Sequence, residues 1–447
     1  MFKLNFQKRI RDFQRSRFVK DIFKLQAGSI FSRLLSVFSA IVFARVLGAN
    51  DYGIYSLIFG FVSVATIFMG VEGGSVVLIL LPQAYARGDR TEIKNIISYF
   101  IKVNLATSLV IGALIILIAP LLTQWWYHDY NIGSLARIVL AGAILSSFSD
   151  SLLLCLQAVR KIKHYVIVST LNSFLAVIIP LVLVFFFGLS GIVWGNFFNN
   201  FIFFTIAIII YGVWIKSNPL LPKYHEIVSG IFTVKIKKYF SFGFSMLVDK
   251  KIASFYSSLP LMILGAFVAP ATVGYFKIAV KYIGLIGVLT KPIANLLMVQ
   301  LPKSLVDGAV VFKKNFEKVS FYTPLLSIPF IIVAVIAAEF LVVTLYGSEY
   351  RPVVPLVYLL AIGPVLNGVG IGIGSAFRVL NKVKGSIIIN IFILALGLPL
   401  VYYSIKYFGV VAAALVNMLW PLVSIIICFI YVEIILVKMI KKPANNL

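Results

Sequence analysis

The chain alternates between long apolar runs and short polar connections. Each run has about 20 residues, the length at which a helix crosses a hydrocarbon layer of about 30 Å, and each ends at charged residues or at Gly, Pro or Asn. Continuous runs predict spanning α-helices, whereas a transmembrane β-barrel needs short alternating segments. The twelve predicted helices lie near residues 25–47, 54–81, 97–122, 134–157, 165–187, 190–214, 239–267, 272–300, 320–345, 353–376, 385–405 and 408–436.

The composition is typical of an integral membrane protein. Hydrophobic residues make up 61% of the 447 residues and charged residues 12%, against about 45–50% and about 25% in soluble domains. Eleven runs follow the first one, so we interpret it as a retained span and not as a cleaved signal peptide. Cys155 and Cys428 fall within predicted helices, which indicates apolar packing and no disulfide.

The basic residues predict the orientation of the chain. With Met1 placed in the cytoplasm, 30 of the 40 Lys and Arg residues fall on that side, and two, Arg351 and Lys406, fall on the opposite side. Positive charge collects on the cytoplasmic side of membrane proteins, so we expect both termini there. The net charge of +25 then reflects topology and contact with anionic lipids, and nucleic acid is not an expected partner.

Three basic segments lie outside the predicted lobes. Residues 1–24 place Phe2 and three further apolar residues on one face, which is typical of a helix on the inner membrane surface; a basic disordered tail is the alternative. Residues 215–238 predict a cytoplasmic linker with a short amphipathic helix. Residues 438–447 predict a basic cytoplasmic tail.

The remaining chain divides into two halves that resemble each other. A shift of 218 residues places Gly191 on Gly409, and a shift of 217 places Gly48 on Gly265; chance similarity between apolar sequences is the alternative. A repeat of six helices gives two lobes related by a pseudo-two-fold axis along the membrane normal, with substrate between them. We therefore predict an all-α integral membrane fold with alternating access. The predicted lobes are residues 25–214 and 239–437.

Charged residues inside the spans are the candidates for a substrate path. Each costs about 2.5–3.5 kcal/mol to insert and usually faces a partner or a water-filled cavity. The basic ones are Arg33, Arg45, Arg137, Lys250, Lys251, Lys277, Lys281 and Lys291. The acidic ones are Glu72, Asp150, Asp249, Glu339 and Glu433. The interior is therefore net basic.

Two arginines of the first helix receive different interpretations. Arg33 lies near the predicted midplane and shares an arc of about 140° with a series of serines, which predicts the wall of a polar cavity. Alternatively, the serines bond to backbone carbonyls and let helices pack closely. Arg45 lies close to the Gly48 turn, so we expect it to reach the outer interface and anchor the helix.

The second half offers cations at similar depth. The 217-residue shift carries Arg33 onto Lys250, beside Asp249, which could neutralise it. In the next helix, Lys277, Lys281 and Lys291 fall within about 80° of arc and could guide an anion. The alternatives are a structural Asp–Lys pair, and a Lys277 and a Lys291 that reach opposite interfaces and leave only Lys281 to explain. The residues predicted to contact substrate are Arg33, Asp249, Lys250, Lys251, Lys277 and Lys281. No histidine cluster indicates a metal site.

The run QAGSIFSRLLSVFSAIVFARVLGANDYGIYSL, which begins at Gln26, resembles the first helix and turn of prokaryotic polysaccharide flippases. The resemblance rests on Arg33, on Ala-Arg-x-Leu-Gly at 44–48 and on Tyr-Gly at 52–53, and it extends more weakly over residues 20–440. Those proteins form the Wzx-type branch of the multidrug/oligosaccharidyl-lipid/polysaccharide exporter superfamily.

This resemblance implies a multi-pass transporter of the prokaryotic cytoplasmic membrane, not an enzyme. The implied substrate is a polyprenyl-pyrophosphate-linked oligosaccharide, such as an O-antigen unit, moved to the outer leaflet. A basic cavity suits its diphosphate because Arg and Lys form charge-assisted hydrogen bonds with phosphate. No cofactor is implied, and the coupling ion, H⁺ or Na⁺, stays open. Besides the lipid-linked oligosaccharide, the implied partners are membrane lipids and other polysaccharide assembly proteins, and the implied state is a monomer.

Departures from related families limit the substrate. Lipid II flippases generally carry a second arginine six residues after the first and have fourteen helices, whereas this chain has Ser39 there and twelve predicted spans. A multidrug or other solute exporter is the alternative function, although the drug-extruding branch uses acidic cavity residues. A membrane polymerase, ligase or glycosyltransferase is a further alternative, which the short extracytoplasmic connections disfavour.

Overall fold

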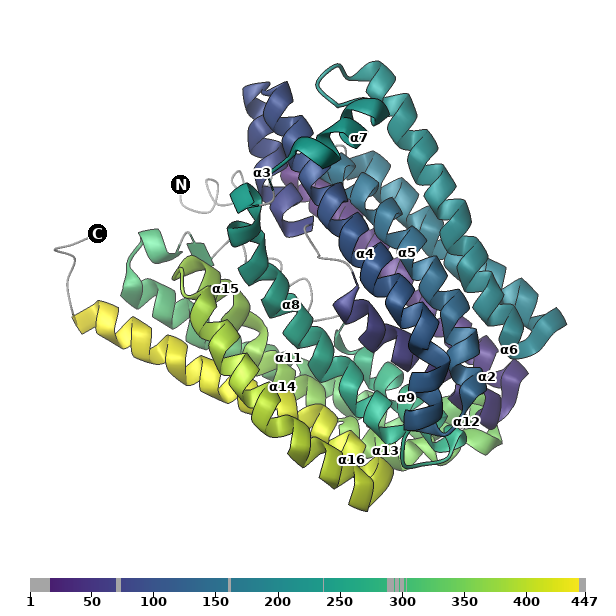
Figure 1. Ribbon diagram of the computed structural model, residues 1–447. Coiled ribbons are helices and arrows are strands. Elements are labelled where there is room, and N and C mark those ends of the chain that lie inside the picture. The colour runs from purple at the N-terminus through teal and green to yellow at the C-terminus, as the bar shows by residue number, and fades with distance from the viewer. Residues whose placement is uncertain are drawn as a thin grey trace. The chain divides into compact units, whose positions relative to one another are not determined.

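The protein is helical throughout the part of the chain that the structure describes (Figure 1). This computed structural model describes residues 17–69, 74–159, 162–235, 237–287 and 304–441, together with residues 293, 297, 301 and 302. Side chains at 17–27, 29–30, 74–76, 162, 217, 237–238 and 240–250 are not among the described ones. Residues 1–16 of the predicted surface helix at 1–24 fall outside the described residues, whereas residues 17–24 form the beginning of α2. Most of the predicted tail at 438–447 also falls outside them.

The helices follow one another along the chain with short connections. Those of the first half are α2 (Arg17–Phe68), α3 (Gly74–Arg87), α4 (Arg90–Tyr127), α5 (Tyr130–Ala158), α6 (Ile162–Ser217) and α7 (Tyr224–Thr233). Those of the second half are α8 (Lys237–Leu264), α9 (Pro270–Gly284), α11 (Ala309–Ile336), α12 (Ala338–Tyr346), α13 (Val353–Leu360), α14 (Gly363–Val369), α15 (Ile373–Val379) and α16 (Val383–Lys441). Short 3-10 helices occupy Ser348–Tyr350 and Gly370–Gly372.

Three of these helices contain a glycine at which the chain reverses. Gly48 in α2, Gly188 in α6 and Gly409 in α16 have non-helical φ/ψ angles with positive φ, a conformation that favours glycine. The two segments of α6 lie side by side, because a Cβ added to Gly195 would lie 2.6 Å from the Cα of Pro180. Each reversal therefore joins two spans.

The spans agree with the twelve predicted from the sequence. Seven segments of the described residues are long and apolar enough to cross a membrane, and three of them contain a reversal, so they account for ten predicted spans. A shorter apolar helix, Lys251–Leu264, corresponds to the seventh span. The eighth, predicted at 272–300, is described mainly as α9.

One predicted span is interrupted. It was predicted at 54–81, but α2 ends at Phe68, Met69 is not helical and α3 begins at Gly74; residues 70–73 lie outside the described residues. The span predicted at 353–376 is confirmed as the apolar segment Val353–Val379, in which α13, α14 and α15 follow one another with short turns between them. The 3-10 turn at Gly370–Gly372 falls in the glycine-rich sequence GPVLNGVGIGIG at 363–374, and glycine raises the free energy of a helix interior.

The two halves repeat each other in backbone conformation. Gly188 has φ/ψ angles of 55° and −134°, and Gly409 has 56° and −134°. The structural offset at this turn is thus 221 residues, so the sequence shift of 218 that placed Gly191 on Gly409 is wrong there by three residues. The same offset of 221 relates Gly53 to Gly274, whose backbones touch. The connection between α8 and α9 is therefore longer than its counterpart at Gly48.

The chain packs as two compact units, each described by itself. The first contains Met1–Ala40, Phe68–Ile118 and Arg137–Gly243, and the second contains Ile41–Ile67, Ala119–Ala136 and Phe244–Leu447. These units are defined by contacts within the structure, whereas the predicted lobes were defined by the sequence repeat. The two divisions do not test each other, so the lobe boundaries stay predictions. The second unit therefore includes segments from both halves of the sequence.

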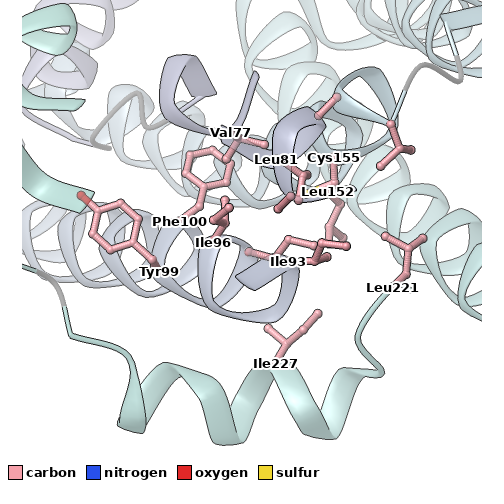
Figure 2. Close-up of a cluster of buried hydrophobic side chains, with 14 of the residues drawn as sticks. Val77, Leu81, Ile93, Ile96, Tyr99, Phe100, Leu152, Cys155, Leu221 and Ile227 are labelled. Atoms are coloured by element: carbon pink, nitrogen blue, oxygen red, sulfur yellow. The ribbon is translucent and has the colours of Figure 1, made fainter. Parts of the chain in front are cut away.

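The first unit has an apolar core that also holds the linker between the halves (Figure 2). Ile93, Ile96 and Phe100 of α4 contact residues of α3 and α5, and Ile227 of α7 joins the same cluster. The linker helix predicted within 215–238 is thus confirmed as α7. Its burial shows that the linker is a packed element of this unit.

In the second unit, helices from the two halves cross at glycines. A Cβ on Gly53 would lie 1.9 Å from the carbonyl oxygen of Pro270, and one on Gly274 would lie 3.2 Å from the nitrogen of Gly53. Tyr52, which is buried, packs edge-on against the ring of Tyr350. Small residues let helix backbones approach closely in membrane proteins. We call this contact of α2 with α9 the glycine crossing.

Adding a methyl group should separate the glycine crossing. We expect Gly53→Ala to destabilise the protein by about 1–3 kcal/mol, the usual cost of overpacking a well-packed contact. Thermal unfolding of the purified protein in detergent measures the effect. Gly284→Ala is the matched control, because nothing lies within 4 Å of a Cβ at that position. Equal melting temperatures for both variants would contradict the close contact.

Candidate substrate path and the buried charges

Several charges inside the spans bind backbone carbonyls and are structural. Arg137 of α5 donates from Nε to the carbonyl of Ile116 and from Nη2 to the carbonyl of Leu117, both at 2.7 Å. Pro120 lies within α4 and has no N–H, so it leaves the carbonyl four residues earlier, that of Ile116, without its helical donor. The guanidinium supplies the missing donor.

Arg45 satisfies the end of another helix. Its guanidinium donates to the carbonyls of Thr344 and Leu345, the latter at 2.7 Å. Both carbonyls belong to the last turn of α12, where helix carbonyls have no intrahelical donor and the helix dipole favours a cation. Nearby, the hydroxyl of Tyr350 donates to the carbonyl of Ala44 at 2.8 Å. The structural role predicted for Arg45 is confirmed by these contacts, and its position at the outer interface stays a prediction.

Lys251 is placed in the same way. Its Nζ lies 3.2 Å from the carbonyl oxygen of Thr66, within the last turn of α2. This contact accounts for the charge without a substrate. The observed contact of Lys251 is therefore structural. The prediction that Lys251 also contacts substrate stays a prediction.

Arg33 is different from these three cations. Its side chain is half-buried on α2, and it has no hydrogen bond or ion pair with the described residues of its own unit. The neighbouring Ser32 donates to the carbonyl of Gly28 at 2.9 Å and contacts the hydroxyl of Ser173 on α6 at 2.8 Å. Ser39 likewise donates to the carbonyl of Ser36. The hydrogen bonds of these serines agree with the alternative interpretation, in which serines bond to backbone carbonyls and let helices pack closely. Arg33 remains the functional candidate of this helix.

Lys277 and Lys281 lie one turn apart on α9, and both are half-buried. The opposite side of α9 is buried, with Phe276 and Ile283 in the interior of the second unit. A cavity of about 190 Å³ between α9, α14 and α16 is lined partly by the amide side chain of Asn367. Neither lysine lines this cavity. The two lysines form a cationic face of α9 in the second unit.

The other predicted charges divide into two groups. Asp249 and Lys250 lie on α8, but their side chains, like Glu72 and Lys291, fall outside the described residues. Arg351 pairs with Glu339 at 2.6 Å, and Lys313 pairs with Glu433 at 3.0 Å. Two of the five acids predicted within the spans are thus bound to basic residues.

Arg33 belongs to the first unit, whereas Lys251, Lys277 and Lys281 belong to the second. Their meeting across a cleft therefore stays a prediction. Chemically, the described candidates offer hydrogen-bond donors and positive charge to an anion. Groups of at least three His, Cys, Asp or Glu that could hold a metal ion are absent from the described residues.

Sequence reasoning missed the tyrosines of the glycine crossing. Tyr350 contacts the rings of Tyr52, Tyr275 and Tyr346. About 300 residues separate Tyr52 from Tyr350, and no local pattern relates them. The one signal in the sequence is that a tyrosine adjoins the glycine in both Tyr52-Gly53 and Gly274-Tyr275.

Comparison with solved structures shows the fold. A multidrug resistance MATE family transporter of the MOP superfamily, in an inward-facing conformation, superposes with a TM-score of 0.75 at 14% identity, covering 95% of this chain and 100% of that one. The lipid II flippase MurJ, in an inward closed conformation, gives 0.65 at 13% identity, covering 91% and 87%. A MATE structure in complex with MaL6 gives 0.66 at 13%, covering 95% and 97%. No curated protein matches the sequence at a significant level.

The helices, their reversals and these superpositions define a multi-pass membrane protein with the fold of the MOP superfamily of transporters. Residues 42–355 match the sequence profile of a family described as polysaccharide biosynthesis protein. This match covers more than half of the chain, so the chain belongs to that family. The family and the fold agree with the resemblance to polysaccharide flippases at the first helix.

Arg137 should matter for stability, and part of its effect should depend on Pro120. We expect Arg137→Gln to lower the free energy of unfolding by about 1.5–3 kcal/mol, the range for hydrogen bonds to charged groups. In a Pro120→Ala background the helix regains an N–H for the Ile116 carbonyl, so the same substitution should cost clearly less. Thermal unfolding of the four proteins of this double-mutant cycle measures the coupling. Equal costs in both backgrounds would show that Arg137 acts elsewhere.

Proposed function

We propose that the protein moves a polyprenyl-diphosphate-linked oligosaccharide from the cytoplasmic to the outer leaflet of a prokaryotic cytoplasmic membrane. The observation that carries this proposal is the match of residues 42–355 to a polysaccharide biosynthesis family. The fold is shared with a lipid II flippase and is therefore compatible with a substrate linked to a lipid. At 13–14% identity, the similarity to this flippase and to MATE structures concerns the fold and does not identify the substrate.

Arg33, Lys277 and Lys281 are the proposed contacts for the diphosphate. Arg33 has a guanidinium that can donate two parallel hydrogen bonds to phosphate oxygens. Lys277 and Lys281 place two ammonium groups one turn apart, which suits a group with several negative charges. The glycan would move along the polar path while the prenyl chain stays in lipid. No bond of the substrate is made or broken.

Alternating access requires one end of the path to be closed while the other is open. The glycine crossing and the Arg45 contact with α12 join the two halves of the sequence near the Gly48 reversal of α2. The distribution of positive charge predicts this reversal to be outside. We propose that these contacts close the outer end of the path. Opening to the outer leaflet would then separate Gly53 from Pro270 and Arg45 from Leu345.

Transport in proteoliposomes tests the proposal. The substrate is a fluorescent lipid-linked oligosaccharide in the inner leaflet, and its arrival in the outer leaflet is measured by accessibility to a lectin. We expect Arg33→Gln and the pair Lys277→Gln/Lys281→Gln to reduce the rate about tenfold or more, because each removes charge-assisted hydrogen bonds worth about 1.5–3 kcal/mol.

Lys384→Gln is the matched control, because Lys384 is exposed at the start of α16 and should leave the rate unchanged. Unaltered melting temperatures would show that the site variants fold. Wild-type rates in Arg33→Gln and in the double lysine variant would overturn the assignment of the site. Failure of the wild-type protein to move the lipid, together with efflux of cationic dyes, would overturn the function.

A further inference from the structure

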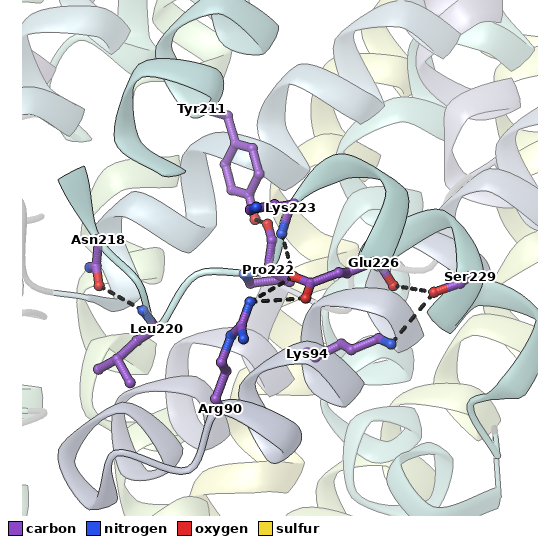
Figure 3. Close-up of polar contacts among 9 residues, drawn as sticks. All are labelled: Arg90, Lys94, Tyr211, Asn218, Leu220, Pro222, Lys223, Glu226 and Ser229. Atoms are coloured by element: carbon purple, nitrogen blue, oxygen red, sulfur yellow. Dashed lines mark hydrogen bonds and ion pairs between the residues drawn. The ribbon is translucent and has the colours of Figure 1, made fainter. Parts of the chain in front are cut away.

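The helix α7 is fixed to the first unit along one side. Ile227 is buried in the core shown in Figure 2, and a Cβ on Gly230 would lie 2.2 Å from the hydroxyl of Ser98. At the start of α7, Nη2 of Arg90 lies 2.9 Å from Oε1 of Glu226 (Figure 3). These contacts determine which face of α7 points away from the protein.

That outward face carries exposed apolar side chains. Val228 and Phe232 lie four residues apart and expose 55% and 81% of their surfaces. Residues at this spacing lie on one side of a helix. An exposed apolar stripe on a short helix beside membrane spans is typical of a helix in the boundary between lipid headgroups and acyl chains. The start of α7 therefore lies where headgroups are present.

A cavity of about 510 Å³ lies between the end of α6 and the start of α7. Its α6 wall is apolar, with Ile209 and Val213, and Gly212 lets the ring of Tyr224 approach closely. Lys216 and Lys223 also line it. Ile209 is about 10 Å along the helix axis from Lys216. The cavity is thus apolar in the span and basic at the end of the span.

The charge of this cavity is positive. Lys216, Lys223 and His225 are exposed, and neither lysine forms an ion pair within the described residues. Glu226 is the adjacent acid, but Arg90 binds its carboxylate and the backbone N–H of Lys223 donates to it at 2.7 Å. This backbone hydrogen bond and the positive charge of Arg90 lower the pKa of Glu226. The carboxylate is therefore already paired, and the lysines are left to attract an anion.

We propose that this cavity binds one anionic glycerophospholipid of the membrane. Its phosphate lies between Lys216 and Lys223, and an acyl chain lies along Ile209 and Val213. The combination of two ammonium groups at the headgroup level with an apolar wall of about 10 Å matches a phospholipid and not a free anion. The site is separate from the proposed substrate path and does not depend on the transported molecule.

Native mass spectrometry of the full-length protein in detergent tests the proposal. Dioleoyl phosphatidylglycerol and dioleoyl phosphatidylcholine, which share acyl chains and differ in net charge, are titrated in parallel. We expect one phosphatidylglycerol to bind at least tenfold more tightly than phosphatidylcholine. In Lys216→Gln/Lys223→Gln this preference should fall at least tenfold, whereas Lys216→Arg/Lys223→Arg should retain it.

Lys438→Gln/Lys441→Gln is the charge-matched control, because both lysines lie on the last turns of α16 and line neither cavity. Val213→Trp, which fills the apolar wall without changing charge, should also weaken phosphatidylglycerol binding. Equal binding of the two lipids, or full retention in the double glutamine variant, would overturn the site. Displacement of the lipid by millimolar inorganic phosphate would also overturn it, because it would show a free-anion site.

Discussion

The structure depends on the need to satisfy helix carbonyls where no water is available. The last four carbonyls of a helix, and the carbonyl before a proline, have no intrahelical donor, and in hydrocarbon each costs several kcal/mol. Side chains from other helices supply donors at many of these points. Besides Arg45, Arg137 and Lys251, the indole of Trp126 donates to Met262 near the end of α8. The hydroxyl of Tyr282 donates to Ala334 near the end of α11.

These contacts also decide which segments pack together. Trp126 and Arg45 belong to the first half of the sequence, and their acceptors belong to the second. Both bonds lie within the unit that contains Ile41–Ile67, Ala119–Ala136 and the second half. The glycine crossing brings the backbones close enough for such bonds to form. Polar satisfaction and small-residue packing therefore act at the same place, as expected where the hydrophobic effect between helices is weak.

Local patterns predicted the spans well because each span carries its own signal of length and hydrophobicity. They failed after Phe68, where α2 ends inside a run that was predicted as one continuous span. The structural role of Arg45 was predicted correctly. It followed from the position of Arg45 along its helix, which the local sequence contains. The partners of Arg45 lie about 300 residues away, and a single sequence contains nothing that pairs them.

Arg137 shows a signal that the sequence contains and that hydrophobicity alone does not reveal. Pro120 leaves the carbonyl of Ile116 without a donor at a known depth in the membrane. The next helix of the hairpin passes the same depth at Arg137, 17 residues after Pro120. An arginine at that depth can be predicted as the donor from the sequence alone. The same reasoning fails for Lys251, whose acceptor at Thr66 depends on the break after Phe68, which the apolar pattern did not predict.

The two structural arginines share one arrangement. Each serves two successive carbonyls, Ile116 with Leu117 and Thr344 with Leu345, because a planar guanidinium has parallel donors. Arg33 carries the same fork without such a pair of carbonyls among the described residues of its unit. Phosphate oxygens accept parallel hydrogen bonds from a guanidinium, whereas lysine binds phosphate as a point charge. An arginine therefore suits the diphosphate contact proposed for this position better than a lysine would.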